Sequence, residues 1–199
     1  MKILPKSFYL RDDVVLIARD LLGKILLTQF DGIITSGIII ETEAYAGTTD
    51  RASHAYGNRR TDRTEVMYSA GGTAYVYLCY GVHSLFNVVT NRKDVPDAVL
   101  IRGIKPLTGI DTMIKRSGKT SINKDLGIGP GRVSKILGIH YSKTGMDLTK
   151  KPANKSEEGI WLEDDGIEVV DKSIIVGPRI GVQYAAEDAL RPYRFRISL

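Results

Sequence analysis

Apolar and polar positions follow a helical period in three parts of the chain. In residues 12–23 (DDVVLIARDLLG) the apolar side chains recur at the spacing of one helical face, namely Val14, Ile17, Ala18, Leu21 and Leu22. The aspartates that open this segment can cap a helix, and Gly23 can end it. Residues 107–118 and 130–139 predict two further helices, the second of which opens with a proline, a residue favoured in the first helical turn.

Most other apolar runs are short, rich in β-branched or aromatic residues and bounded by turn residues, which predicts strands. Residues 24–30 and 33–40 are two such runs, joined by Asp31-Gly32, a strong β-hairpin signal. The second runs directly into the sequence ETEAY. Further strands are predicted at residues 73–80, 84–90, 98–104, 160–164, 167–171, 173–182 and 193–199.

The order of these elements predicts the fold class. Strands outnumber helices, and tight hairpins favour antiparallel pairing over repeated βαβ units. No linker divides the chain, and the polar stretch 143–158 is interpreted as a surface excursion. We therefore expect a mixed α and β fold in which residues 1–199 form a single domain. Its β core should be mainly antiparallel and curved, like an open barrel, with helices flanking it.

Composition narrows the possible chemistry. The formal net charge of +5 favours polyanionic partners such as nucleic acid, although many proteins are mildly basic for other reasons. The single cysteine, Cys79, excludes an intramolecular disulfide and a multi-cysteine zinc site, and the three histidines lack metal-ligand spacing. We expect no metal. The first residues lack the apolar core of a secretory signal, and no apolar run approaches the roughly 20 residues of a membrane span, so we expect an intracellular protein.

The ETEAY sequence carries the first candidate site. If the strand continues through it, Glu41, Glu43 and Tyr45 point to one face. Two carboxylates at the end of a buried strand suit acid–base chemistry, because desolvation and like-charge proximity drive their pKa values apart. Solvated charges at a strand end would give the same pattern, so these residues alone leave both interpretations open.

Aromatic and basic residues supply further candidates. Tyr75, Tyr77 and Cys79 share a strand face on which a nucleobase can stack, a contact worth roughly 1–3 kcal/mol per base, but a core strand can look the same. Tyr80 lies at the predicted hairpin tip, where it can act as a wedge in DNA. The arginine-bearing stretch 48–69 predicts a long ordered loop, a length typical of functional loops. The GPGR sequence that ends at Arg132 opens a helix and suits either an anion such as a DNA phosphate or a plain helix cap.

These sequences in this order are similar to the alkyladenine (3-methyladenine) DNA glycosylase family. The matching blocks are ETEAY, SHAY, AYVYLCYGVHSLFNVV, AVLIRGIKPLTG and GPGR, and the resemblance extends from Leu21-Leu22-Gly23 to the C-terminal PRIGV and RPYRF. It implies a monofunctional glycosylase that initiates base excision repair by hydrolysing the N-glycosidic bond of damaged purines flipped out of duplex DNA. The substrates that it implies are 3-methyladenine, 7-methylguanine, hypoxanthine and ethenoadenine. Water is the implied nucleophile, and no cofactor is implied.

The resemblance assigns roles to particular residues. Glu43 matches the catalytic glutamate that orients the attacking water, whereas Glu41 is expected to be structural. Arg102 matches an arginine near the sugar-phosphate and the catalytic water, and is expected to be catalytic together with Glu43. Tyr80 matches the side chain that intercalates where the nucleotide has left. The base-binding positions are matched by Tyr45, His54, Tyr77 and Asn87, the last of which stands at the pocket floor, where its bulk excludes the 2-amino group of guanine.

Departures and alternatives qualify this expectation. Thr64 stands where the family usually has asparagine, which bears on a loop or phosphate contact, and residues 188–190 replace a stretch that usually contains tryptophan, which bears on packing.

The expected partner is double-stranded DNA containing damaged purines. We expect the protein to act as a monomer, without membrane association, in the cytoplasm or nucleoid if the source is prokaryotic. Two alternatives are a non-catalytic DNA-lesion-binding protein and a carbohydrate glycosidase that uses Glu41 and Glu43 as its carboxylate pair.

Overall fold

A tight hairpin at Asp31-Gly32 joins β2 (Ile25–Phe30) to β3 (Ile33–Tyr45), as predicted. In this computed structural model, which describes residues 2–121 and 123–198, Asp31 and Gly32 have φ angles of 53° and 71°. Positive φ at both central residues is the requirement of a type I′ turn, which suits the twist of the strands that it joins. The strand β3 continues through the whole ETEAY sequence.

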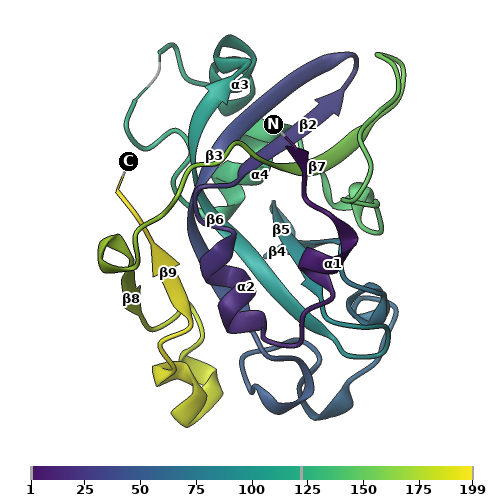
Figure 1. The fold of residues 1–199 in the computed structure, drawn as a ribbon, viewed down its shortest axis with the longest axis vertical. Helices are drawn as coiled ribbons and strands as arrows, with labels where there is room; N and C mark the ends of the chain where they lie inside the picture. Colours follow the sequence, from purple (N-terminus) through teal and green to yellow (C-terminus); the bar gives the residue numbers. More distant parts are fainter. Residues whose placement is uncertain (1, 122, 199) are drawn as a thin grey trace.

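The sheet is antiparallel in every strand pairing of the described residues. Nine strands form it in this part of the chain, in the order β1-β7-β2-β3-β6-β5-β4, with β9 paired to β3 and β8. Figure 1 shows that the sheet curves strongly without closing. The remaining strands are β1 (Lys2–Ile3), β4 (Ala74–Cys79), β5 (His83–Thr90), β6 (Asp97–Thr108), β7 (Gly159–Asp164), β8 (Ile175–Gly177) and β9 (Arg194–Arg196).

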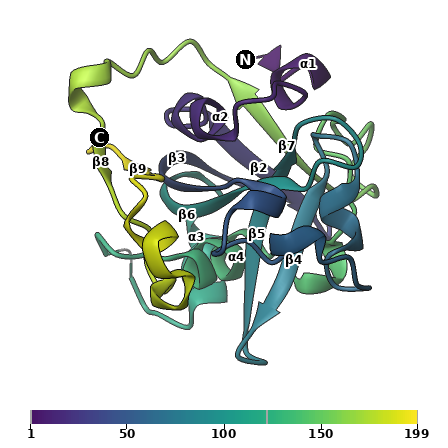
Figure 2. The same ribbon diagram turned by 90° about the horizontal axis from the view of Figure 1, so that it is seen from below.

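Helices form in all three predicted segments, but the helix predicted at residues 107–118 starts later, because Leu107 and Thr108 belong to β6 and Gly109 caps the helix. Helix α2 (Val14–Asp20) begins at Asp13, whose side chain accepts a hydrogen bond of 2.9 Å from the backbone N–H of Leu16. Helices α3 (Ile110–Ser117) and α4 (Pro130–Leu137) both end at a glycine in the left-handed conformation. In Figure 2, α2 lies on one side of the long strands β3 and β6, and α3 and α4 lie on the other.

Several short elements were not predicted. They are the strand β1, the helix α1 (Lys6–Tyr9) and the 3-10 helices η1 (Gly47–Thr49), η2 (Tyr56–Asn58), η3 (Glu65–Tyr68), η4 (Tyr141–Lys143), η5 (Asp171–Ser173) and η6 (Gln183–Leu190). The 3-10 helices η1, η2 and η3 lie along the predicted loop 48–69. Thr64, one of the departures from the family pattern, is buried there and accepts a hydrogen bond of 2.8 Å from the backbone N–H of Thr61.

Two strand predictions near the C-terminus need correction. The strand predicted at residues 167–171 is wrong, because this segment has no strand partner and instead passes over the end of α2. The side chain of Val169 covers Gly23 so closely that a Cβ on that glycine would lie 2.8 Å from it. The strand predicted at residues 173–182 is shortened to β8, since the following Pro178 has no N–H to donate to a neighbouring strand.

One hydrophobic core joins elements from both ends of the chain into a single compact domain. Its buried members include Ile17, Leu21, Ile39, Phe86, Ile101, Ile104, Val133, Ile136 and Phe195. Phe195 brings β9 against β3, so the C-terminal segment lies beside the end of the ETEAY strand. Within residues 2–121 and 123–198, none of the helices has the length and apolar character needed to cross a membrane.

Candidate active site

The end of β3 places two carboxylates and a tyrosine beside an arginine of the neighbouring strand. Register shifts between Ile39 and Glu41 and between Glu41 and Thr42 mark an irregularity in the β3–β6 pairing, a device that re-aims side chains. Arg102 of β6 lies 3.3 Å from Glu43 and 3.4 Å from Glu41, measured from its Nε to the carboxylate Oε1 atoms. The prediction that Glu41, Glu43 and Tyr45 share one side of the strand agrees with these contacts.

The Glu43 carboxylate is fully buried, and each of its oxygens accepts a hydrogen bond. The Tyr45 hydroxyl donates to Oε2 at 2.9 Å, and the backbone N–H of Ile180 donates to Oε1 at 2.8 Å. Burial raises the pKa of Glu43, while the charge of Arg102 and these two hydrogen bonds oppose the rise. The result is a carboxylate removed from water yet supplied with partners for its negative charge.

Glu41 has a different environment. Its Oε1 accepts a hydrogen bond of 2.7 Å from Nε of Arg194 on β9 and also contacts Arg102. Two arginines therefore contact Glu41, and one of these ion pairs joins β3 to β9. This pairing does not resemble the two free carboxylates of a carbohydrate glycosidase, which flank the bond that is cleaved.

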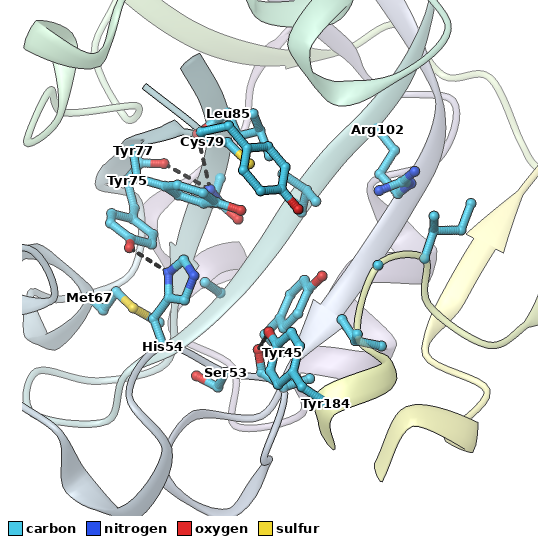
Figure 3. A pocket seen from close by; sticks show the side chains of 18 residues that line it. Tyr45, Ser53, His54, Met67, Tyr75, Tyr77, Cys79, Leu85, Arg102 and Tyr184 are labelled. Carbon is cyan, nitrogen blue, oxygen red and sulfur yellow. Dashed lines mark hydrogen bonds between the residues drawn. The ribbon is translucent and has the colours of Figure 1, made fainter. Parts of the chain in front are cut away.

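A cavity of about 180 Å³ opens beside this carboxylate cluster. The predicted residues Tyr45, His54, Tyr77, Tyr80, Asn87 and Arg102 all line it. Figure 3 shows His54, Tyr75 and Tyr77 on one side, Tyr45 and Tyr184 across from them, and Arg102 on a third side. Glu43 stands behind the wall, bonded to Tyr45. The structure thus brings all seven predicted site residues together.

The aromatic wall opposite Tyr45 is held by its own contacts. Nδ1 of His54 lies 2.8 Å from the Tyr75 hydroxyl, and the rings of His54 and Tyr77 meet edge to face with centroids 4.6 Å apart. Burial lowers the pKa of His54 to about 4, with the charges of Arg63 and Arg59 acting in the same direction. The imidazole is therefore neutral at pH 7, and this wall offers polar aromatic surface without a positive charge on the histidine.

Asn87 and Tyr80 both line the cavity, but the first is buried and the second is exposed. The Asn87 amide is buried and donates hydrogen bonds to the backbone oxygens of Tyr75 and Leu85 at 3.1 and 3.2 Å, which fixes its orientation. Tyr80 lies in the turn between β4 and β5 with φ of 51°, and its side chain is 95% exposed. Figure 2 shows this hairpin projecting from the body of the molecule. The Tyr80 ring is therefore not held by packing within its own chain and is available to a partner.

The GPGR sequence borders a second cavity, which shares Tyr80 with the first. This space of about 620 Å³ is lined by Gly129, Arg132, Lys119 and Lys135 among others. The arginines of the loop 48–69 differ in their availability. Arg60 pairs with Glu65 and Asp94, whereas Arg63 lies over the Tyr77 ring at 5.1 Å.

Sequence reasoning missed the contribution of residues 180–184. Ile180 supplies a hydrogen bond to Glu43, and Tyr184, which is 68% exposed, donates from its hydroxyl to the backbone oxygen of Ala52 at 3.1 Å. The cavity lining also includes Gly181 and Val182. The PRIGV block was a signal that this segment matters, but no periodicity in the chain indicates that it meets residues so far away in sequence.

No group of three or more metal-ligating side chains is gathered in the part of the chain that the structure describes.

The lowered pKa of His54 predicts a pH-dependent loss of stability. In the unfolded chain His54 binds a proton below its ordinary pKa of 6.5, whereas in the folded protein it does so only below about pH 4. The free energy of unfolding should therefore decrease as the pH falls from 6.5 to 4. The contribution is about 2–3 kcal/mol at pH 4.5. Urea unfolding at pH 7 and pH 4.5 measures it.

The variant His54→Gln should lose correspondingly less stability over the same interval. The exposed His140→Gln is the matched control and should follow the parent protein. An equal loss in the parent and in His54→Gln would contradict the assignment.

The sequence also matches known proteins over almost its whole length. The family model described as Methylpurine-DNA glycosylase matches residues 7–198. Proteins from Chlamydia felis, Clostridium perfringens and Bacillus mycoides, each described as "Putative 3-methyladenine DNA glycosylase", are 45%, 42% and 43% identical to this chain. These alignments cover 98%, 98% and 96% of this chain and 96%, 95% and 94% of the respective relatives. The chain belongs to the methylpurine-DNA glycosylase family.

Proposed function

We propose that this protein is a monofunctional DNA glycosylase that removes alkylated or deaminated purines from duplex DNA. One observation carries the proposal: the buried Glu43 carboxylate is hydrogen-bonded to Tyr45, which lines an aromatic cavity of about the size of a single base. The cavity volume of about 180 Å³ lies below the roughly 300–1,000 Å³ of ordinary ligand pockets. A space of this size favours one nucleobase over a whole nucleotide.

In the proposed reaction the bond between C1′ and the purine nitrogen breaks, and its electron pair leaves with the base. A cationic alkylpurine departs neutral, whereas hypoxanthine or ethenoadenine departs as an anion that takes a proton from solvent. A water oxygen bonds to C1′, and Glu43 orients this water and accepts its proton. The Glu43 charge also stabilises the positive charge that develops on the sugar. A carboxylate oxygen accepts more than one hydrogen bond, so Oε1 and Oε2 retain capacity for this water beside their present donors. The contacts of Arg102 to Glu43 are long, which leaves its guanidinium able to turn toward a phosphate.

The cavity walls support a selection for damaged purines. Tyr45 on one side and Tyr77 with His54 on the other provide aromatic faces between which a flipped base can stack. A cationic alkylpurine gains additional attraction from such faces. Asn87 at the floor presents a fixed amide where the 2-amino group of guanine would have to fit. The substrate set is 3-methyladenine, 7-methylguanine, hypoxanthine and ethenoadenine.

Base flipping is supported by the position of Tyr80. Its exposed ring borders both cavities, so insertion into the stack would leave the extruded base beside the first cavity and the adjoining backbone beside the basic rim of the second. The whole chain acts as one glycosylase domain, as a monomer on double-stranded DNA. Such a substrate puts the protein inside the cell, at the nucleoid of a prokaryotic source.

Replacing Glu43 by glutamine should remove activity without removing DNA binding. The substitution keeps the shape but eliminates the charge and the proton acceptor, and loss of a general base costs roughly 100-fold or more in rate. Single-turnover release of free base from duplexes that each carry one of the four lesions measures the effect.

The buried Glu163, which accepts a hydrogen bond from Trp161 and does not line the cavity, provides the matched control Glu163→Gln with parental activity. Release at the parental rate by Glu43→Gln would refute the role of Glu43. A parent protein that binds lesion DNA but releases no base would instead favour the non-catalytic lesion-binding alternative.

The pH dependence of base release should reflect the raised pKa of Glu43. Because the reaction needs the carboxylate, the single-turnover rate should fall with decreasing pH and reach half its plateau above pH 4.5, the ordinary value for glutamate. Spontaneous base loss is subtracted with enzyme-free DNA. A rate that stays constant down to pH 4.5 would be incompatible with this proposal.

Removing the ring of Tyr80 should weaken excision from duplex DNA. The loss of one stacking contact worth about 1–3 kcal/mol corresponds to a decrease of roughly 5- to 150-fold at subsaturating enzyme. Tyr80→Ala is compared with Tyr80→Phe, which keeps the ring and should retain most activity. Equal rates for the parent protein and Tyr80→Ala would exclude intercalation by this residue.

A further inference from the structure

A buried ion pair lies directly behind the cavity. The side chains of Asp50 and Arg179 have no solvent exposure, and Nη2 of Arg179 donates to Oδ1 of Asp50 at 2.8 Å while Nη1 donates to Oδ2. Neither residue lines the cavity, and neither takes part in the proposed reaction. Two opposite charges have therefore been taken out of water next to the site without a direct chemical task.

The other hydrogen bonds of this pair join three separate segments. Arg179 donates to the backbone oxygen of Ala44 on β3 at 2.9 Å and to that of Asp188 in η6 at 3.1 Å. Asp50 accepts from the backbone N–H of Ala46 at 3.1 Å and of Ala52 at 3.0 Å. The end of β3, the loop that leads to His54 and the C-terminal segment are thus fixed to one pair of side chains.

These anchored positions adjoin the groups that hold Glu43. Ala44 lies between Glu43 and Tyr45 in sequence, and Ile180, whose N–H binds Glu43, directly follows Arg179. The Arg179 guanidinium also lies over the Tyr45 ring at 4.8 Å from its centroid. Tyr45 donates the second hydrogen bond to Glu43. The ion pair therefore contacts one donor, Tyr45, and adjoins the other, Ile180, in sequence.

Stability alone is a poor explanation for this pair. A buried ion pair loses hydration that its mutual attraction only partly offsets, and apolar replacements of similar volume are often as stable or more stable. Nε of Arg179 is buried without an acceptor among the described residues, which adds a further cost. What charged groups offer over apolar ones is directional bonding to several backbone atoms at once.

We propose that Asp50 and Arg179 are positioning residues that hold Tyr45 and the Ile180 N–H against the Glu43 carboxylate. The inference rests on the proposed excision reaction, to which it adds two residues that contact neither the base nor the sugar. Their effect on the reaction is transmitted through the donors that fix the orientation and the charge of Glu43.

The decisive variant replaces both charges at once, as Asp50→Leu with Arg179→Met. Such a change removes the directional bonds while filling the space. The backbone groups that lose their partners should lower the thermal stability, so the rates are compared at a temperature at which both proteins are folded. The single-turnover rate at saturating enzyme should fall about 10- to 100-fold, because small displacements of reacting groups cost this much. Asp50→Asn, which keeps the shape and one acceptor but removes the charge, is the second variant and decides the matter if the double variant does not fold.

The pH profile separates positioning from a general loss of structure. The hydrogen bonds from Tyr45 and Ile180 lower the pKa of Glu43, so weakening them should raise it and move the acid limb of the rate profile to higher pH. A protein that is merely less folded would lose amplitude with the acid limb unchanged. The substrate for these pH profiles is the lesion duplex that the parent protein processes fastest.

Glu187→Gln is the matched control, because the exposed Arg51–Glu187 pair joins the same loop and the same C-terminal segment. It should leave the rate and the acid limb unchanged. The positioning role would be overturned if folded variants of the Asp50–Arg179 pair kept the parental rate. It would also be overturned if they had a lower rate but the parental acid limb. A parent protein that releases no base would overturn the proposed function instead, so the two failures are distinct.

Discussion

Burial of the Glu43 carboxylate is the constraint around which the site is built. A carboxylate without solvent exposure is tolerated only where other groups replace the water that it has lost. Here the replacements come from its own strand through Tyr45, from β6 through Arg102 and from the C-terminal segment through Ile180. Three parts of the chain must therefore meet at one point, and the irregular pairing of β3 and the docking of β9 bring them there.

The same opposition of effects gives the site its proposed chemistry. Desolvation raises the pKa of Glu43, whereas its hydrogen bonds and the arginine charge resist that rise. Such a balance suits a group that has to be ionised at neutral pH and still accept a proton. Across the cavity, the neutral His54 and the tyrosines provide contact without a competing cation on the histidine, which accords with the proposed electron-poor base between them.

Much of the fold followed from local patterns. The hairpin at Asp31-Gly32, the cap at Asp13 and the strands that carry ETEAY and YVYLCY are fixed by residues close together in sequence, and all are confirmed. The strand expected at residues 167–171 was wrong for the opposite reason. A β-branched composition indicates that a segment can pair, but pairing also requires a free neighbouring strand, and this segment covers Gly23 instead.

The sequence by itself determined the kind of fold, its antiparallel pairing and the cluster of acidic and aromatic residues proposed as the site. Each of these depends on side-chain periodicity or on short motifs, which act over a few residues. Only the tertiary structure decided that the Ile180 N–H donates to a carboxylate 137 positions away and that Asp50 and Arg179 form a buried ion pair. Contacts of this range form when the curved sheet brings the C-terminal segment back to β3, and no local pattern along the chain specifies the partner.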